Sequence, residues 1–224
     1  GRDGSEQQWE LLAMEQEEED VYLRELAGVE DLEHATNLQI VINTTTSTVS
    51  HLGSKLGRLE ELNLNNSVIA SLRDLGTGFR SLTVLWVSRC GLPGLEGIGA
   101  MTALRELYAS FNDISDLQPL DACSELEVLD LEGNCVSELH SVIYLSACSN
   151  LQSLTLTGNP VADLEDYRQQ VCSSLTSLQT LDDVDIEEAE RTSSSQQRNP
   201  PRPAEAQPAS PRLQDSPATQ HPGE

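Results

Sequence analysis

Apolar residues recur at a fixed spacing along the middle of the chain. The pattern is L-x-x-L-x-L-x-x-N/C-x-L, and it begins in phase at Leu59, Leu82, Leu104, Leu126 and Leu151. Five consecutive matches, each starting 22 to 25 residues after the one before, indicate a repeat architecture instead of a chance motif. Weaker units flank this series, one at Leu38, Ile40 and Ile42 and another at Leu178 and Leu181.

The L-x-L core of each repeat predicts a short β-strand. Its leucines point into the molecule and the residues between them point out, because side chains alternate along a strand. Apolar residues in the second half of each repeat, such as Leu72, Leu95, Leu117 and Leu139, predict short helices or helical turns. Because no single repeat buries both its faces, stacking must supply the core and caps must cover the ends. The pattern therefore predicts an α/β leucine-rich-repeat solenoid with parallel strands on the concave face, helical turns on the convex face, and helical caps.

A polar position recurs just beyond each predicted strand. It holds asparagine in three repeats, at Asn112, Asn134 and Asn159, and Ser67 and Cys90 in the two before. A buried asparagine amide can satisfy backbone groups that a tight turn leaves unpaired. We therefore expect a ladder of buried asparagines, interrupted at Ser67 and Cys90.

Composition divides the chain into three parts. Residues 1–36 predict an acidic, helical N-terminal segment and cap, with a possible capping box at Ser5–Gln8. We interpret the acidic run Glu15–Asp20 as a solvated helix face, in preference to a docking site. Residues 37–190 predict the repeat domain and its C-terminal cap, in which Val171, Leu175, Leu178 and Leu181 follow a helical spacing.

The C-terminal part, residues 191–224, is rich in Ser, Gln and Pro. It has almost nothing to form a core, so we expect disorder. Two Ser-Pro steps, Ser210-Pro211 and Ser216-Pro217, are candidate phosphorylation sites, and Pro200–Pro203 contains P-x-x-P. Such short patterns recur by chance, and a plain linker is the favoured interpretation.

The charge of the chain narrows its partners. Acidic residues outnumber basic ones 37 to 13, for a formal net charge of -24. Binding to nucleic acid or to an anionic membrane is disfavoured, and a basic protein partner is favoured. The five cysteines are an odd number without a C-x-x-C pair, which favours reduced thiols used as small core residues in a cytoplasmic protein.

The sequence offers no recognisable catalytic chemistry. The four histidines lack the neighbouring ligands of a metal site, and no nucleophile-elbow, phosphate-loop or dinucleotide motif occurs. With 37 carboxylates, some pair will lie close in space by chance. We therefore expect a binding protein, not an enzyme, with no cofactor and no metal.

The outward positions of the predicted strands define a candidate partner site on the concave face. Trp86 and Tyr108 should be neighbours on adjacent strands, and Phe111 follows in the same repeat as Tyr108. Aromatic anchors ringed by polar groups are typical of interface hot spots. The alternative is that these rings pack only on one another or under the N-terminal segment. The candidate site comprises Trp86, Arg89, Arg105, Glu106, Tyr108, Phe111, Asp130 and Glu132.

The repeats resemble the SDS22-like class of leucine-rich repeats, in their 22-residue length and their L-x-x-L-x-L-x-x-N-x-I form. More specifically, the chain is similar to the leucine-rich repeat-containing protein 56 family, with the likeness most specific around Trp86, Cys90 and Tyr108. The segments that carry it are Ser71–Thr77, Val84–Leu92, Glu106–Leu117 and Leu126–Asn134.

This resemblance implies a role in cilia and flagella. The family is associated with assembly or intraflagellar transport of outer dynein arms, so the implied partners are dynein-arm or transport components, bound by a monomeric adaptor in the cytoplasm and the cilium. Two alternatives remain open: a phosphatase-regulatory or nuclear scaffold, as in other members of the repeat class, and a structural component of the axoneme.

Overall fold

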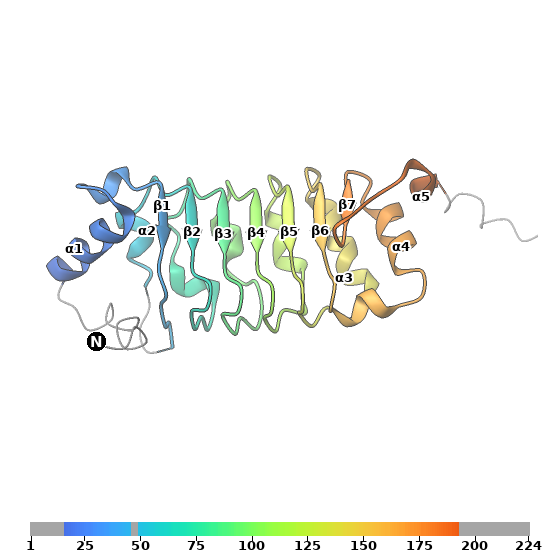
Figure 1. Cartoon of the computed structure of the whole chain (residues 1–224), viewed down its shortest axis with the longest axis horizontal. Coiled ribbons are helices and arrows are strands. Elements are labelled where there is room, and N and C mark those ends of the chain that lie inside the picture. Colours follow the sequence, from blue (N-terminus) through green and yellow to red (C-terminus); the bar gives the residue numbers. More distant parts are fainter. Residues whose placement is uncertain (1–15, 46–48, 193–224) are drawn as a thin grey trace, which may run out of the picture.

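The computed structural model describes residues 16–45 and 49–192. These residues form an elongated solenoid in which the strands stand side by side in chain order (Figure 1). The predicted capping box at Ser5–Gln8 and the Pro-rich tail from residue 193 onward lie outside the described residues. The strands are β1 Asn37–Gln39, β2 Glu61–Asn63, β3 Val84–Trp86, β4 Glu106–Tyr108, β5 Val128–Asp130, β6 Ser153–Thr155, β7 Thr180–Leu181 and β8 Val184–Asp185.

The strands form one eight-stranded sheet, parallel from β1 to β7. In-register pairing places the central leucine of each strand beside that of the next, as in Leu62 with Leu85 and Leu85 with Leu107. From β1 to β7 this leucine column is at most 3% exposed, so it forms the spine of the core. The predicted fold class is confirmed.

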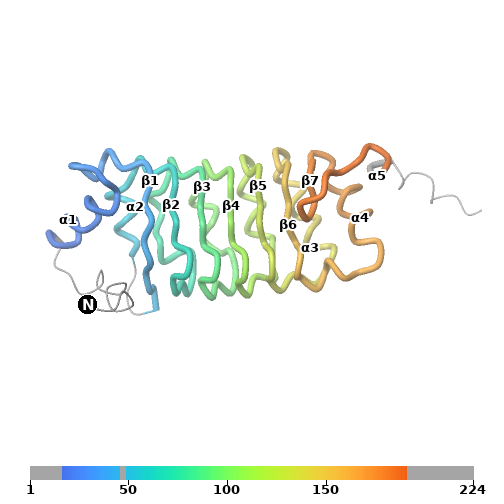
Figure 2. Tube along the Cα trace, viewed as in Figure 1, coloured from blue at the N-terminus to red at the C-terminus, as the bar shows by residue number. Residues whose placement is uncertain are grey.

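Short helical segments return the chain behind the sheet, as the trace in Figure 2 shows. Those after β1 lie between consecutive strands, whereas the segment Leu32–His34 precedes β1. Each contributes one or two buried residues, such as Leu72, Leu120 and Leu145. The prediction of helical turns on the convex face is therefore confirmed. The segments are η2 Leu32–His34, α2 Leu52–Lys55, η3 Leu72–Leu75, η4 Ile98–Ala100, η5 Gln118–Ala122, α3 Leu139–Ile143, η6 Tyr144–Ala147 and η7 Pro160–Asp163.

The asparagine ladder forms as predicted. The Asn134 amide donates to the carbonyl of Ala109 in the previous repeat at 2.9 Å and to Leu131 in its own repeat at 3.0 Å. Its Oδ1 accepts from the backbone N–H of Ile114 at 3.1 Å. Where the ladder is interrupted, Ser67 Oγ accepts one backbone N–H at 3.0 Å. Each asparagine thus joins two repeats through hydrogen bonds to buried backbone groups.

The residue just before each ladder position has a left-handed backbone. Two of these residues are glycines, for which this conformation carries no steric cost. The other three residues carry side chains, and for them this backbone conformation costs about 1–2 kcal/mol. The column, with its φ angles, consists of Asn66 at 64°, Arg89 at 58°, Phe111 at 57°, Gly133 at 63° and Gly158 at 75°.

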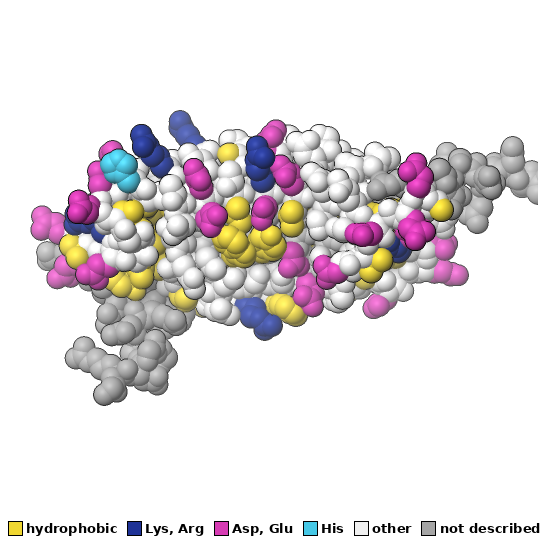
Figure 3. Space-filling model, turned by 45° about the horizontal axis from the view of Figure 1, so that its top comes forward, with side chains coloured by type: hydrophobic (Ala, Val, Ile, Leu, Met, Phe, Trp, Pro, Cys, Tyr) yellow, Lys and Arg dark blue, Asp and Glu magenta, His cyan; other side chains and the backbone are white. Residues whose placement is uncertain are grey.

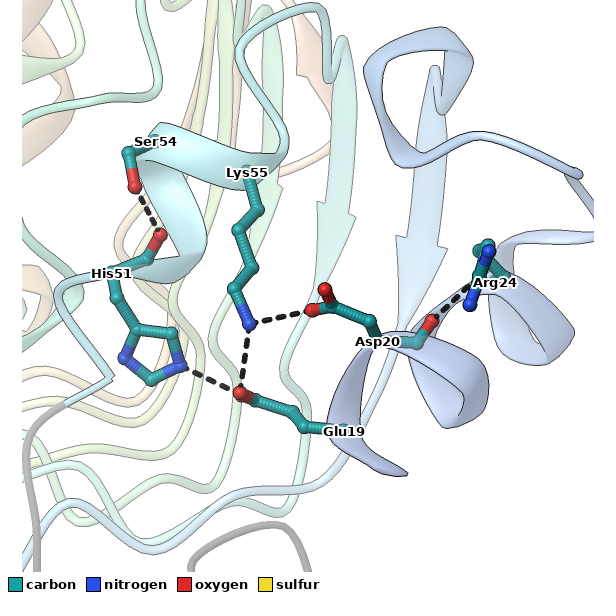
Figure 4. Close-up of polar contacts among 6 residues, drawn as sticks. All are labelled: Glu19, Asp20, Arg24, His51, Ser54 and Lys55. Atoms are coloured by element: carbon teal, nitrogen blue, oxygen red, sulfur yellow. Dashed lines mark hydrogen bonds and ion pairs between the residues drawn. The ribbon is translucent and has the colours of Figure 1, made fainter. Parts of the chain in front are cut away.

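The N-terminal cap is helix α1, Gln16–Ala27, whose Leu23 is fully buried against the first repeat. Its acidic run is not wholly solvated, which corrects the prediction. Glu17 and Glu18 are exposed, but Glu19 is buried. Figure 4 shows the Glu19 carboxylate facing α2, where it pairs with Lys55 Nζ at 2.9 Å and His51 Nε2 at 2.7 Å. The contacts with Lys55 and His51 stabilise the carboxylate at a site that the apolar pattern did not reveal.

Lys55 also forms an ion pair with the next acidic residue of α1, Asp20. Lys55 Nζ lies 2.6 Å from Asp20 Oδ1, and the Lys55 side chain is 16% exposed. Burial lowers the pKa of Lys55, but the hydrogen bonds to Asp20 and Glu19 and the charges of these carboxylates together outweigh burial and leave the pKa raised. The α1 helix is therefore fastened to α2 by charge as well as by apolar packing.

The C-terminal cap differs from the prediction. The expected helical run through Leu178 and Leu181 ends earlier, because α4 spans only Tyr167–Ser174. Leu181 instead continues the leucine column in β7, paired with Leu154. The chain then reverses into the antiparallel β8 and ends its described part in α5 Glu188–Thr192.

The cap is held by two buried or half-buried polar side chains of α4. Arg168 donates to Glu190 Oε1 at 2.6 Å and to the carbonyls of Leu181 and Asp185. The Tyr167 hydroxyl donates to Asp182 Oδ2 at 3.0 Å. These contacts join α4, the β7–β8 hairpin and α5 into one unit that closes the solenoid.

Four of the five cysteines are buried in the core as predicted, whereas Cys135 is exposed. Cys135 follows the ladder residue Asn134 and lies on the surface of the turn, so its apolar character gave the wrong expectation. Within the described residues, no helix is long and apolar enough to cross a membrane.

Candidate functional site

Two aromatic rings stack on the concave face. Parallel register pairs Trp86 at the end of β3 with Tyr108 at the end of β4, as the sequence predicted. Their ring centroids lie 5.6 Å apart with an interplanar angle of 8°. Both side chains are half-buried, because they lie over the sheet and not within the core. The strand spacing of about 4.8 Å makes this stacking the natural arrangement of rings on adjacent parallel strands.

Carboxylates border the aromatic pair. The Tyr108 hydroxyl donates to Glu106 Oε2 at 2.8 Å. Burial raises the pKa of Tyr108 to about 12, and the hydrogen bond to Glu106 and the charges of Glu106 and Asp130 act in the same direction. The Tyr108 phenol is therefore neutral at physiological pH and orients the Glu106 carboxylate beside the rings.

Asp130 continues the outward column on β5, next to Tyr108. Its Oδ2 accepts from the Ser110 hydroxyl at 2.7 Å and its Oδ1 from the backbone N–H of Glu132 at 2.9 Å. Ser110 is 6% exposed and was not among the predicted site residues. Ser110 lies two residues beyond Tyr108 in the same repeat, at the next outward-facing position, and this spacing was the signal that could have identified it.

A second group lies in the turns that follow the strands. The guanidinium carbon of Arg89 lies 4.3 Å from the centroid of the Phe111 ring, a cation–π arrangement. A Cβ added to Gly133 would lie 2.7 Å from Phe111 Cδ1, so the ring packs directly over this glycine. Phe111 is nevertheless 43% exposed.

Arg105 is placed apart from the aromatic pair. It lies just before β4, and its guanidinium donates to Glu127 Oε1 of the next repeat at 3.0 Å. Both side chains of this pair are exposed. The eight predicted residues therefore separate into a stacked pair with Glu106 and Asp130, a turn group of Arg89, Phe111 and Glu132, and the outlying Arg105.

A hollow of about 200 Å³ borders Trp86 on the side away from Tyr108. It forms because the outward column drops from the large indole of Trp86 to the shorter Asn63 and Gln39 on β2 and β1. The sequence analysis did not predict this hollow. Its lining residues are Asn37, Leu38, Gln39, Glu61, Asn63 and Trp86.

Seen obliquely, this side of the molecule carries a cluster of hydrophobic side chains near its centre, flanked by acidic side chains (Figure 3). Acidic groups of the site outnumber its two arginines, in keeping with the charge of the whole chain. No group of three or more His, Cys, Asp or Glu within the described part of the chain is placed to hold a metal ion. The eight predicted residues thus contribute to an acidic, aromatic surface.

The fold and the repeat define the class of the protein. A leucine-rich repeat family profile matches residues 58–206, and the chain belongs to this family of protein-binding scaffolds. Within it, the chain is similar to human leucine-rich repeat-containing protein 56, with 50% identity over 123 residues, which are 55% of this chain and 23% of the human protein. This confirms the resemblance inferred from the sequence.

Two further relatives extend the comparison. The Trypanosoma brucei brucei homolog of leucine-rich repeat-containing protein 56 is 40% identical over 122 residues, 53% of this chain and 16% of that protein. The acidic leucine-rich nuclear phosphoprotein 32 family member A of Drosophila pseudoobscura is 31% identical over 140 residues, 62% of this chain and 53% of its own length. The chain thus spans less than a quarter of the length of the protein 56 relatives.

Solved structures agree on the fold. A leucine-rich repeat protein of Leptospira interrogans gives a TM-score of 0.54 at 21% identity, covering 67% of this chain and 37% of that protein. Internalin C2 of Listeria monocytogenes gives 0.52 at 23% identity, covering 71% of this chain and 70% of the other. At these identities the likeness concerns the solenoid alone.

Proposed function

We propose that this chain is a non-enzymatic adaptor for the assembly or intraflagellar transport of outer dynein arms, acting in the cytoplasm and the cilium. The proposal rests on the likeness to leucine-rich repeat-containing protein 56, which extends from mammals to a trypanosome. We further propose that the concave face binds the partner protein, through the eight predicted residues from Trp86 to Glu132.

Two features support the proposed binding site. They are the stacked rings of Trp86 and Tyr108 and the left-handed backbone at Phe111. The stacked pair lies on an open sheet face, where it adds little to the core. Phe111 holds an exposed ring at a position where glycine would be free of steric cost. Side chains kept in costly conformations cluster at functional sites.

The test is affinity purification of the full chain from ciliated cells, with mass-spectrometric identification of captured proteins. The wild type is compared with a Trp86→Ala/Tyr108→Ala double variant and with Phe111→Gly, after circular dichroism and denaturant unfolding confirm that each is folded. Recovery of dynein-arm or intraflagellar-transport proteins by the wild type and their loss from the variants is the expected result. Equal recovery by all three moves the site away from the concave face.

A second candidate is a nuclear scaffold, favoured by the 31% identity to an acidic leucine-rich nuclear phosphoprotein. Both chains are acidic, and composition cannot separate the two functions. Imaging of the tagged full chain in ciliated cells separates them, because nuclear accumulation with capture of nuclear or phosphatase proteins supports this candidate. If the chain instead stays in axonemes through detergent and high-salt extraction, a structural axonemal role replaces the adaptor.

A further inference from the structure

The stack of rings on the concave face ends abruptly at β3. Tyr108 covers one face of the Trp86 indole, and the other face borders the hollow over β1 and β2. The register places Asn63 where a third ring of the stack would lie. Its short amide cannot cover an indole, so a flat aromatic wall is left open to a flat group from another molecule.

The hollow is polar and acidic around this wall. Asn37, Gln39 and Glu61 are exposed, and among the described residues the Glu61 carboxylate has no hydrogen bond or ion pair. In contrast, Glu106 is engaged by the Tyr108 hydroxyl, and Asp130 by Ser110 and a backbone N–H. Among the described residues, the Glu61 carboxylate is therefore available beside the indole to pair with a group of another molecule.

We propose that this hollow binds an arginine side chain of a partner protein, with the guanidinium stacked on Trp86 and paired with Glu61. The guanidinium is planar, stacks on aromatic faces and donates in a fork that matches a carboxylate, so it fits both features of the hollow at once. The chain contains the same interaction within itself, because Arg89 lies over the Phe111 ring at 4.3 Å. The formal charge of -24 favours a basic partner segment through long-range attraction.

This inference rests on the proposed function as a protein-binding adaptor and specifies what the concave face recognises. It can fail without that function failing, since a partner that binds only Tyr108 and Phe111 would still be captured from cells. The two results are separated by Glu61→Gln, which tests the arginine hollow and leaves the rings of the wider surface intact.

Trp86 itself provides the readout. The chain has two tryptophans, Trp9 and Trp86, so a Trp9→Phe full chain leaves one indole whose fluorescence reports on the hollow. The probes are capped Gly-Ser-X-Ser-Gly peptides in which X is arginine, lysine or citrulline. Citrulline has the shape of arginine without its charge and is the matched control.

The expected result is a saturable change in Trp86 emission with the arginine peptide. Binding of the citrulline peptide is expected to be about tenfold weaker, and the lysine peptide to fall between them. Glu61→Gln should weaken arginine binding about threefold, whereas Glu125→Gln, which removes an exposed charge outside the hollow, should not. Equal binding of the arginine and citrulline peptides, or equal effects of the two glutamate variants, overturns the proposal.

The other occupant to test is the chain's own tail, which contains Arg198, Arg202 and Arg212. Replacing all three with alanine should leave both the emission of Trp86 and its affinity for the arginine peptide unchanged. If that variant binds the peptide more tightly, the tail competes for the hollow, and the assignment to a separate partner is overturned.

Discussion

The backbones of Gly53, in α2, and Gly78, after η3, approach so closely that neither position has room for a side chain. A Cβ on Gly78 would lie 2.1 Å from the carbonyl carbon of Gly53, and a Cβ on Gly53 would lie 2.8 Å from Gly78 Cα. The obstacle on both sides is backbone, which cannot rotate away. The first two repeats therefore pack at a distance that these glycines set.

Gly78→Ala is accordingly expected to lower the free energy of unfolding by about 3 kcal/mol, because the repeats must separate to admit the methyl group. Urea unfolding followed by circular dichroism measures the change. Gly57→Ala is the control, since nothing lies within 4 Å of its added Cβ and its φ is not in the left-handed region. A control variant as unstable as Gly78→Ala would contradict the explanation.

Asn134→Ala should be among the most destabilising single changes in the chain. It leaves the Ile114 N–H unpaired in the core, at about 1–3 kcal/mol for a buried group left without a partner. It also removes one of the two amide donors to each of the Ala109 and Leu131 carbonyls, which keep those of Asn112 and Asn159. Asn134→Ser should be milder, because Ser67 already occupies the equivalent position and accepts one backbone N–H. Denaturant unfolding that places serine below alanine would oppose this view of the ladder.

Comparing Phe111→Gly with Phe111→Ala distinguishes the contribution of the ring to stability from that of the backbone conformation. Both remove the contact with Arg89, but only glycine relieves the φ of 57°. We expect the glycine variant to be more stable than the alanine variant by about 1 kcal/mol. Unfolding midpoints of the two purified variants give the comparison directly, and equal midpoints would show that the turn carries no backbone cost.

Core thiols should make the chain sensitive to alkali. Burial raises the pKa of Cys90 and Cys148 to about 11 and that of Cys123 to about 12, from an ordinary value of 9.0, and neighbouring acidic groups add to the effect at Cys123 and Cys148. Because the folded-state pKa values are raised, this stability is complete below pH 9 and is lost progressively as pH rises from 9 to the folded values of about 11 to 12. Unfolding measured at pH 8, 10 and 11.5 should show a decline that begins between the first two points and continues to the last.

Thiol labelling tests the same burial near neutral pH. Cys135 is the exposed cysteine, so it should react with a chromogenic disulfide reagent much faster than the other four. A Cys135→Ser variant should lose the fast phase. Two or more fast thiols in the native wild type would contradict the packing described.

Glu19→Ala should loosen the N-terminal cap without unfolding the repeats. The change removes hydrogen bonds to Lys55 and His51, each charge-assisted when its donor is protonated, and we expect local opening of α1 to become easier by about 2 kcal/mol. Amide hydrogen exchange of α1 reports this opening. Glu18→Ala, on the exposed side of the same helix, is the matched control and should leave exchange unchanged.

The leucine spacing predicted the solenoid because each buried position is specified by one repeating residue type. It also placed Trp86 beside Tyr108, since a period-two strand in register leaves only one arrangement. The C-terminal helix was predicted too long because Leu178 and Leu181 satisfy a helical spacing and a repeat spacing equally. The repeat prevailed, since pairing with Leu154 extends the buried column.

Other features could not be read from the pattern. Burial of Glu19 depends on hydrogen bonds from His51 and Lys55, which lie more than 30 residues away along the chain. The separation of Arg105 from the aromatic pair depends on Glu127 offering a closer partner in the next repeat. Such pairings between charges are set by three-dimensional distance, for which the sequence has no periodic signal.

The reversal of chain direction at β8 affects how a second copy of the chain could pair with this edge of the sheet. A row of parallel strands ends in an edge that a second copy could continue, which is how open-ended, head-to-tail fibres arise. In this chain the last pairing is antiparallel and β8 has only two residues, Val184 and Asp185. A copy arriving with its β1 would meet a short strand of opposite polarity, so the β7–β8 hairpin disfavours head-to-tail pairing at this edge of the described sheet.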